Sequence, residues 1–116
     1  MSESRAINAV RKQAAALPEV SVGTVCNKDA YKARNKNFLF LWADDTEYKL
    51  KLKLADSLPE AQQLAAAEPD YYSVGSSGWV DIEMPNKKSP PRGVLKRWVL
   101  ESFRLNAPKK LQAELP

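Results

Sequence analysis

The sequence predicts a single α+β domain in which helices pack on one face of an antiparallel sheet. Three observations lead to this fold class. Stretches near both ends repeat apolar residues at spacings of three and four, short central runs alternate apolar and polar residues, and turn-forming residues separate those runs. The predicted order is helix, three strands, helix, two strands, helix, or α-β(3)-α-β(2)-α. A chain of 116 residues can bury one core but not two, so residues 1–116 form one domain with a C-terminal tail at 105–116.

Residues 4–16 are predicted to form the first helix. Ile7, Val10 and Ala14 follow the spacing of one buried helical stripe, and Pro18 ends the helix. The stretch "VSVGTVCN" (20–27) is rich in β-branched residues but contains Gly23, so it is predicted to be extended, with a short strand as one outcome.

Three strand-like runs follow at 30–34, 37–43 and 47–54 and predict an antiparallel meander. Asn35-Lys36 and residues 44–46 suit the tight turns between them. The middle run is apolar on both faces, which is typical of a central strand. Its aromatic residues are interpreted as core, or as a dimerisation patch if their face is open. Phe38, Phe40 and Trp42 are expected to point one way, and Leu39 and Leu41 the other.

The second half of the chain predicts a helix, a hairpin and a closing helix. Ser57 and Glu60 have the spacing of a capping box, which predicts a helix over 58–68. "YYSV" (71–74) and "GWVDIEM" (78–84) flank the turn at 75–78, and the loop 85–93 is basic and rich in proline. Val80, Ile82 and Met84 are expected to face the core, with Trp79, Asp81 and Glu83 facing away. The last helix, 94–105, places Val94, Leu95, Trp98, Val99, Ser102 and Phe103 on one face.

The residue types that are missing exclude several function classes. The chain contains no histidine and one cysteine, Cys26, so it lacks the usual general base, the usual metal ligands and an internal disulfide. We therefore predict a protein that is not an enzyme and has no metal or cofactor, with Cys26 as a small buried residue. The N-terminus has no signal-peptide pattern and no stretch approaches the roughly 18 apolar residues of a membrane span, which predicts a cytoplasmic location.

The strongest candidate site is a strand with three lysines on one face. Lys49, Lys51 and Lys53 alternate with apolar residues, and Lys32 and Arg34 alternate in the same way on the first strand of the meander. An array of this kind can neutralise phosphates, and Trp79 beside it can stack on an exposed base. The alternative is an ordinary solvated face, in which the lysines pair with Glu47, Asp81 and Glu83.

The second candidate site consists of two basic loops. The chain has a net charge of +4, and residues 85–116 carry an excess of six positive charges. Basic side chains on protruding loops can straddle a duplex, although exposed loops are also rich in lysine for solubility alone. The residues concerned are Lys32, Arg34 and Lys36 in "KARNKN" (32–37) and Lys87, Lys88 and Arg92 in "NKKSPPRG" (86–93).

Four stretches in this order resemble the YjbR (MmcQ-like) family of small bacterial proteins. They are "AYKARNKNFLFL" (30–41), "YKLKLKL" (48–54) before a Ser-capped helix, "GWVDIEM" (78–84) after a tyrosine-rich strand, and the closing helix with "ESF" (101–103). The resemblance covers about residues 6 to 110. It implies a fold similar to that of secretion chaperones, and DNA binding through paired hairpin wings.

Together these patterns predict a DNA-binding protein without clear sequence specificity, because no base-reading motif is present. The alternative is a protein-interaction or chaperone-like module that acts through the sheet or an apolar groove. A monomer or a weak homodimer is expected.

Overall fold

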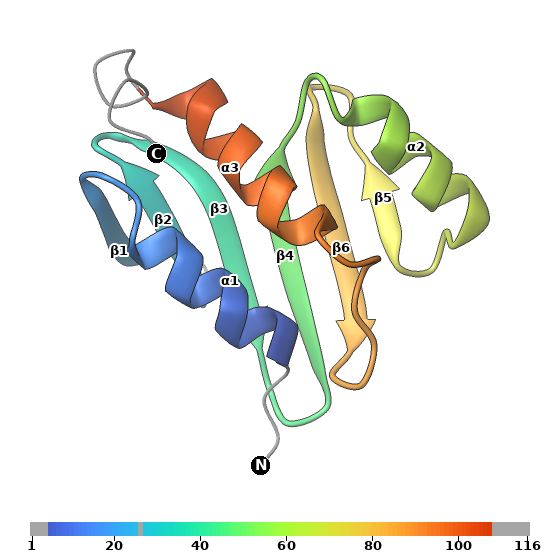
Figure 1. Ribbon diagram of the computed structural model, residues 1–116. Helices are drawn as coiled ribbons and strands as arrows, with labels where there is room; N and C mark the ends of the chain where they lie inside the picture. The colour runs from blue at the N-terminus through green and yellow to red at the C-terminus, as the bar shows by residue number, and fades with distance from the viewer. Residues whose placement is uncertain (1–4, 26, 108–116) are drawn as a thin grey trace.

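A computed structural model describes residues 5–25 and 27–107 and has an α+β fold. Three helices cover one face of an antiparallel sheet of six strands in the order β1-β2-β3-β4-β6-β5 (Figure 1). The predicted fold class and the placement of the helices on one face are therefore confirmed. The elements are α1 (Arg5–Ala15), β1 (Val20–Val25), β2 (Lys28–Ala33), β3 (Lys36–Ala43), β4 (Glu47–Lys53), α2 (Leu58–Ala67), β5 (Tyr72–Val74), β6 (Trp79–Pro85) and α3 (Val94–Asn106).

The expected element order is wrong in one place, because four strands precede α2 instead of three. Residues 20–25 form the full strand β1, which pairs with β2 from Val20 to Val25. A Cβ at Gly23 would meet nothing within 4 Å, so this glycine does not mark a close approach. Strand β1 forms one edge of the sheet and carries no charged residue, and Val22 and Val25 are 54% and 42% exposed. The expectations for Cys26 and for most of the tail fall outside the described residues.

The core lies between the sheet and the helices. Ile7, Val10 and Ala14 of α1 are buried as predicted, and α3 packs across β3 and β4. Trp98 of α3 is fully buried and its ring meets that of Tyr72 on β5 edge to face. The core-facing side of the second hairpin is also confirmed: Val80, Ile82 and Met84 are buried.

A β-bulge in β3 places Phe38 on the helix-covered face, so the interpretation of this residue as core is confirmed. Tyr31 of β2 pairs with Leu39, but the next residue, Lys32, pairs with Asn37. Phe38 is therefore an extra residue, and strict alternation is broken at this point. Its ring packs edge to face against Phe103 of α3, with ring centroids 5.3 Å apart. The prediction that Phe38, Phe40 and Trp42 share a face is thus wrong for Phe38.

Ser102 of α3 joins the two central strands beside this bulge. Its hydroxyl donates to the carbonyl oxygen of Phe38 at 2.5 Å and accepts a hydrogen bond from the backbone N–H of Lys53 at 2.9 Å. Ser102 is fully buried, so both strand groups would be buried without a partner if the hydroxyl were absent. One hydroxyl therefore positions the end of β4 that carries Lys53.

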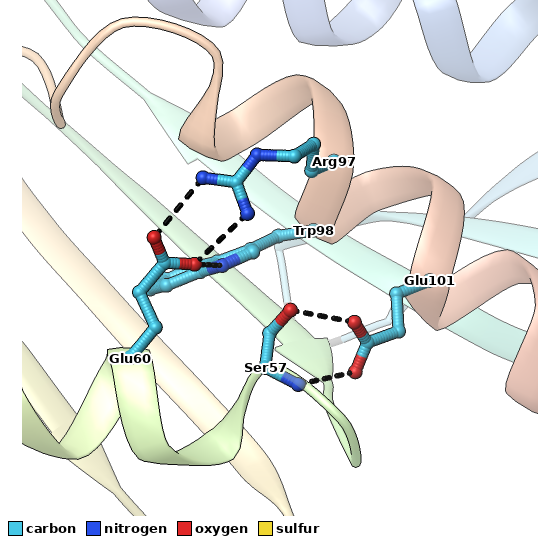
Figure 2. Close-up of polar contacts among 5 residues, drawn as sticks. All are labelled: Ser57, Glu60, Arg97, Trp98 and Glu101. Atoms are coloured by element: carbon cyan, nitrogen blue, oxygen red, sulfur yellow. Dashed lines mark hydrogen bonds and ion pairs between the residues drawn. The ribbon is translucent and has the colours of Figure 1, made fainter.

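The predicted capping box at the start of α2 does not form. The Ser57 side chain makes no cap hydrogen bond within its own helix. Instead Glu101 of α3 accepts hydrogen bonds from the backbone N–H and hydroxyl of Ser57 (Figure 2). It also accepts a hydrogen bond from the backbone N–H of Ala55. Burial alone would raise the pKa of Glu101, but these hydrogen bonds together lower it. The carboxylate of Glu101 thus accepts the hydrogen bond from the Ser57 N–H that the capping box assigned to Glu60.

The other carboxylate of the expected box, Glu60, also turns to α3. It accepts two hydrogen bonds from the guanidinium of Arg97 and one from the indole Nε1 of Trp98 (Figure 2). The bonds from Arg97, followed by that from Trp98, lower the pKa of Glu60. Because these groups satisfy one another, we interpret this cluster as the contact that fixes α2 to α3.

Candidate nucleic-acid interface

The face of the sheet opposite the helices, here called the open face, combines lysines with large aromatic side chains. Alternation along β4 creates it, because Tyr48, Leu50 and Leu52 are buried in the core and the lysines between them point the other way. The predicted common face of Lys49, Lys51 and Lys53 is therefore confirmed. Strand alternation and register add charged and aromatic members to the open face: Lys28, Lys32, Phe40, Trp42, Glu47, Trp79, Asp81 and Glu83.

Phe40 and Trp42 lie on the open face, which overturns the interpretation of both as core. Phe40 pairs with Lys51 across the ladder and Trp42 pairs with Lys49. Phe40 also meets Trp79 of β6, with ring centroids 5.9 Å apart and ring planes tilted by 53°. All three residues are half-buried, and the helices lie on the other face of the sheet. Three aromatic rings on β3 and β6, the two strands that flank β4, thus lie among the lysines.

Only part of the lysine array is neutralised by carboxylates. Lys49 forms an ion pair with Glu83 at 3.4 Å, and its ammonium lies 5.3 Å from the centroid of the Trp42 ring. Lys51 lies opposite Asp81 and Lys53 opposite Trp79, but neither lysine forms an ion pair within the described part of the chain. The alternative of a fully paired, solvated face therefore holds for one lysine of the three.

A shallow hollow lies at the centre of the open face. Its volume is about 190 Å³, below the ~300–1,000 Å³ typical of pockets for drug-sized ligands. Phe40 lines it together with Lys28 and Lys51. Asp81 and Glu83 line its other side. The hollow therefore contains one planar aromatic surface, ammonium donors and carboxylate acceptors. Its volume suits a ligand of the size of one small ring system.

Of the three basic residues in the hairpin tip at 32–37, Lys32 lies on the open face, whereas Arg34 and Lys36 do not. The turn consists of Arg34 and Asn35, and Arg34 adopts the left-handed conformation (φ 58°) expected of the asparagine. Arg34 is outside β2, and its guanidinium forms two hydrogen bonds to Glu19, so it does not extend the alternation of Lys32. Lys32 is half-buried and alternates with the core residues Tyr31 and Ala33.

The two basic loops lie far apart. Lys36 borders the last turn of α3, whereas Arg92 borders its first turn. A helix of 13 residues separates them by about 20 Å. Lys88 is held by an ion pair with Glu68 at 3.1 Å and lies over the Tyr71 ring, and Lys87 is exposed. The loops therefore do not form adjacent wings, and of the candidate residues the structure brings together Lys32, Lys49, Lys51, Lys53 and Trp79.

Sequence reasoning missed Lys28, Phe40 and Trp42 as members of this surface. The signal was present in the alternation of Phe40 and Trp42 with Leu39 and Leu41, but periodicity alone does not tell which face the helices cover. The bulge then removed Phe38 from the set. Asp44 was correctly interpreted as a turn residue: its carboxylate accepts backbone hydrogen bonds from Glu47 and Thr46, which lower its pKa.

Comparisons with protein-family models, with curated proteins and with solved structures found no match to this chain. Within the described ranges, no helix has both the length and the apolar character to cross a membrane. The same residues contain no group of three or more acidic, histidine or cysteine side chains that could hold a metal ion.

Proposed function

We propose that this protein binds DNA through the open face, without catalysis and without base-sequence specificity. The observation that carries the proposal is the placement of five lysines and three aromatic rings on the one face of the sheet that no helix covers. Lysines neutralise phosphates, and each phosphate contact adds affinity that falls as salt rises. The resemblance of the sequence to the YjbR family, for which a DNA-binding role is suggested, supports the same function.

The aromatic rings favour single-stranded DNA over a duplex. Stacking of a base on an aromatic side chain is worth about 1–3 kcal/mol and requires a base whose face is free. Phe40 and Trp79 offer such surfaces beside Lys51 and Lys53, which are without ion pairs in the described part of the chain. In a duplex the bases are stacked on one another, so only the phosphates would be used. Stacking tolerates every base, which is why we expect no sequence preference.

The test is a titration of a fluorescein-labelled 20-nucleotide oligo(dT) and of a duplex of equal length, followed by anisotropy at several salt concentrations. We expect the single strand to bind more tightly at every salt concentration. Tryptophan emission should fall on binding, because Trp42 and Trp79 are on the open face while Trp98 is fully buried. Replacement of Phe40 and Trp79 by Leu should weaken the binding of the single strand by about 1–3 kcal/mol for each stacking contact that is lost.

Charge-reversed variants separate the open face from the loops. Lys51→Glu/Lys53→Glu and Lys36→Glu/Lys87→Glu change the net charge equally, but only the first pair lies on the open face. The first variant should lose at least about tenfold in affinity, or 1.4 kcal/mol, and the second much less. Equal losses would assign binding to overall charge. The absence of a complex with oligo(dT) at low salt would refute the proposal.

A further inference from the structure

A second concave surface lies on the helix side of the molecule, between α1 and the loop that leads into α3. It is a groove of about 530 Å³. Its apolar lining comes from Ala6, Ala9 and Val10 of α1 and from Leu95 of α3. Because the groove lies on the helix-covered side, an occupant would not compete with a ligand on the open face.

The walls of the groove are fixed by internal contacts. The Tyr48 hydroxyl donates to the carbonyl oxygen of Lys88 at 2.7 Å, and Pro90 in the same loop is buried. Across the groove, the side-chain amide of Gln13 donates to the carbonyl oxygen of Lys96 at 3.0 Å and ties α1 to α3. A phenol with the ordinary pKa of 10.0 is protonated near neutral pH, and burial raises the pKa of Tyr48 further, so its hydroxyl can donate to the loop. The groove is thus largely formed before any partner arrives.

The rim of the groove is positively charged. Lys12, Arg92 and Lys96 line it, all three are exposed, and none forms an ion pair among the described residues. Among residues 5–25 and 27–107 no acidic side chain lines the groove, and the first turn of α3 contains none. An occupant with matching chemistry therefore has an apolar face for the lining and carboxylates at its flanks.

We propose that this groove binds an acidic amphipathic helix of a partner protein. A partner that adds a strand needs a free sheet edge, and the groove walls are helices and a loop with two prolines that lack N–H donors. Side chains must therefore supply the contacts, as when a helix places apolar residues at i, i+3 or i+4, and i+7 into a groove. Glutamates beside that stripe would meet Lys12, Arg92 and Lys96.

The test uses fluorescein-labelled, side-chain-stapled 18-residue helical peptides and the full chain. The first peptide carries a leucine stripe flanked by glutamates, the second has lysines in place of the glutamates, and the third has serines in place of the leucines. We expect the first to bind at least about tenfold more tightly than either other peptide. The variant Lys12→Glu/Lys96→Glu should lose at least tenfold for the first peptide. Ala9→Gln places a larger uncharged side chain in the groove at an exposed position, and it should also weaken the binding of the first peptide.

The matched control is Lys36→Glu/Arg104→Glu, which makes the same change in net charge at exposed positions outside the groove. It should bind the first peptide like the unaltered chain, and the groove variants should keep their melting temperature and their affinity for oligo(dT). Equal binding of the acidic and basic peptides, an equal loss in the control variant, or no binding of the acidic peptide would overturn the proposal. Displacement of that peptide by an equimolar fatty acid such as myristate would assign the groove to a small amphiphile and overturn the partner-helix proposal.

Discussion

The two faces of the sheet are built from the same strands, yet aromatic side chains are fully buried on one face and only half-buried on the other. Phe38 and Phe40 are two residues apart on β3. Phe38 is fully buried against Phe103 of α3, whereas Phe40 lies half-buried beside Trp79 on the open face. The comparison shows that an aromatic residue in a central strand need not belong to the core, and that what covers each face decides its role.

The largest expected effect is on stability and belongs to the helix-covered face. Phe38→Ala should lower the free energy of unfolding by about 3–5 kcal/mol, because it leaves a cavity in a packed core. Phe40→Ala should cost much less stability but more affinity for oligo(dT). Urea unfolding and anisotropy titrations of both variants measure this crossover. If Phe40→Ala is as destabilising as Phe38→Ala, the distinction between the two faces fails.

The next effect concerns the buried hydroxyl beside the bulge. Ser102→Ala should lower the free energy of unfolding by about 1–3 kcal/mol, because the Phe38 carbonyl and the Lys53 N–H lose the buried hydroxyl that they bond to. Ser73→Ala, at an exposed position of β5, should change stability by less than about 0.5 kcal/mol. Urea unfolding of both variants measures the difference, and a neutral Ser102→Ala would show that water replaces the hydroxyl.

A smaller effect is expected in the salt dependence of DNA binding. If Lys51 contacts one phosphate of a single strand, Lys51→Gln should reduce the slope of log K against log salt by about 0.7. Lys49→Gln should reduce it less, because Lys49 is already paired with Glu83 at 3.4 Å. Anisotropy titrations at four salt concentrations give both slopes. Equal slopes for the two variants would contradict the assignment of the ion pair.

The smallest effect is a pH dependence on the helix-covered side. The pKa of Glu101 in the folded chain is lowered from its ordinary value of 4.5. The ionised Glu101 therefore adds its full contribution to the free energy of unfolding above pH 4.5, and this contribution is lost as pH falls through the folded pKa. Glu101→Gln should therefore be less stable than the unaltered chain at pH 7, and the difference should shrink below about pH 4. Urea unfolding between pH 3 and 7 tests this, and a pH-independent difference would contradict it.

The sequence allowed most of the fold to be predicted, because periodicity and turn residues act locally. The stripe of α1, the alternation of β4 and the second hairpin depend only on near neighbours in the chain. The failures depend on contacts between distant segments. Residues 20–25 became a strand because β2 offered a partner. The capping box did not form, because the Ser57 N–H donates to Glu101 of α3 and not to Glu60.

The candidate site was predictable to the same extent. Lysine alternation correctly placed Lys49, Lys51 and Lys53 on one face. The rings of Phe40 and Trp42 were assigned to the core because the sequence does not tell which of two apolar faces the helices will cover. Arg34 was assigned to the same face because the turn was expected one residue later, at Asn35-Lys36, than the structure places it.

The uncharged outer edge of β1 has a consequence for the behaviour of the protein in concentrated solution. Natural sheets discourage intermolecular pairing with lysine or proline on their edge strands, and β1 has neither. The opposite edge, β5, is only three residues long and packs against α2. Self-association should therefore begin at β1. A single Val22→Lys substitution should raise solubility without disturbing any buried residue.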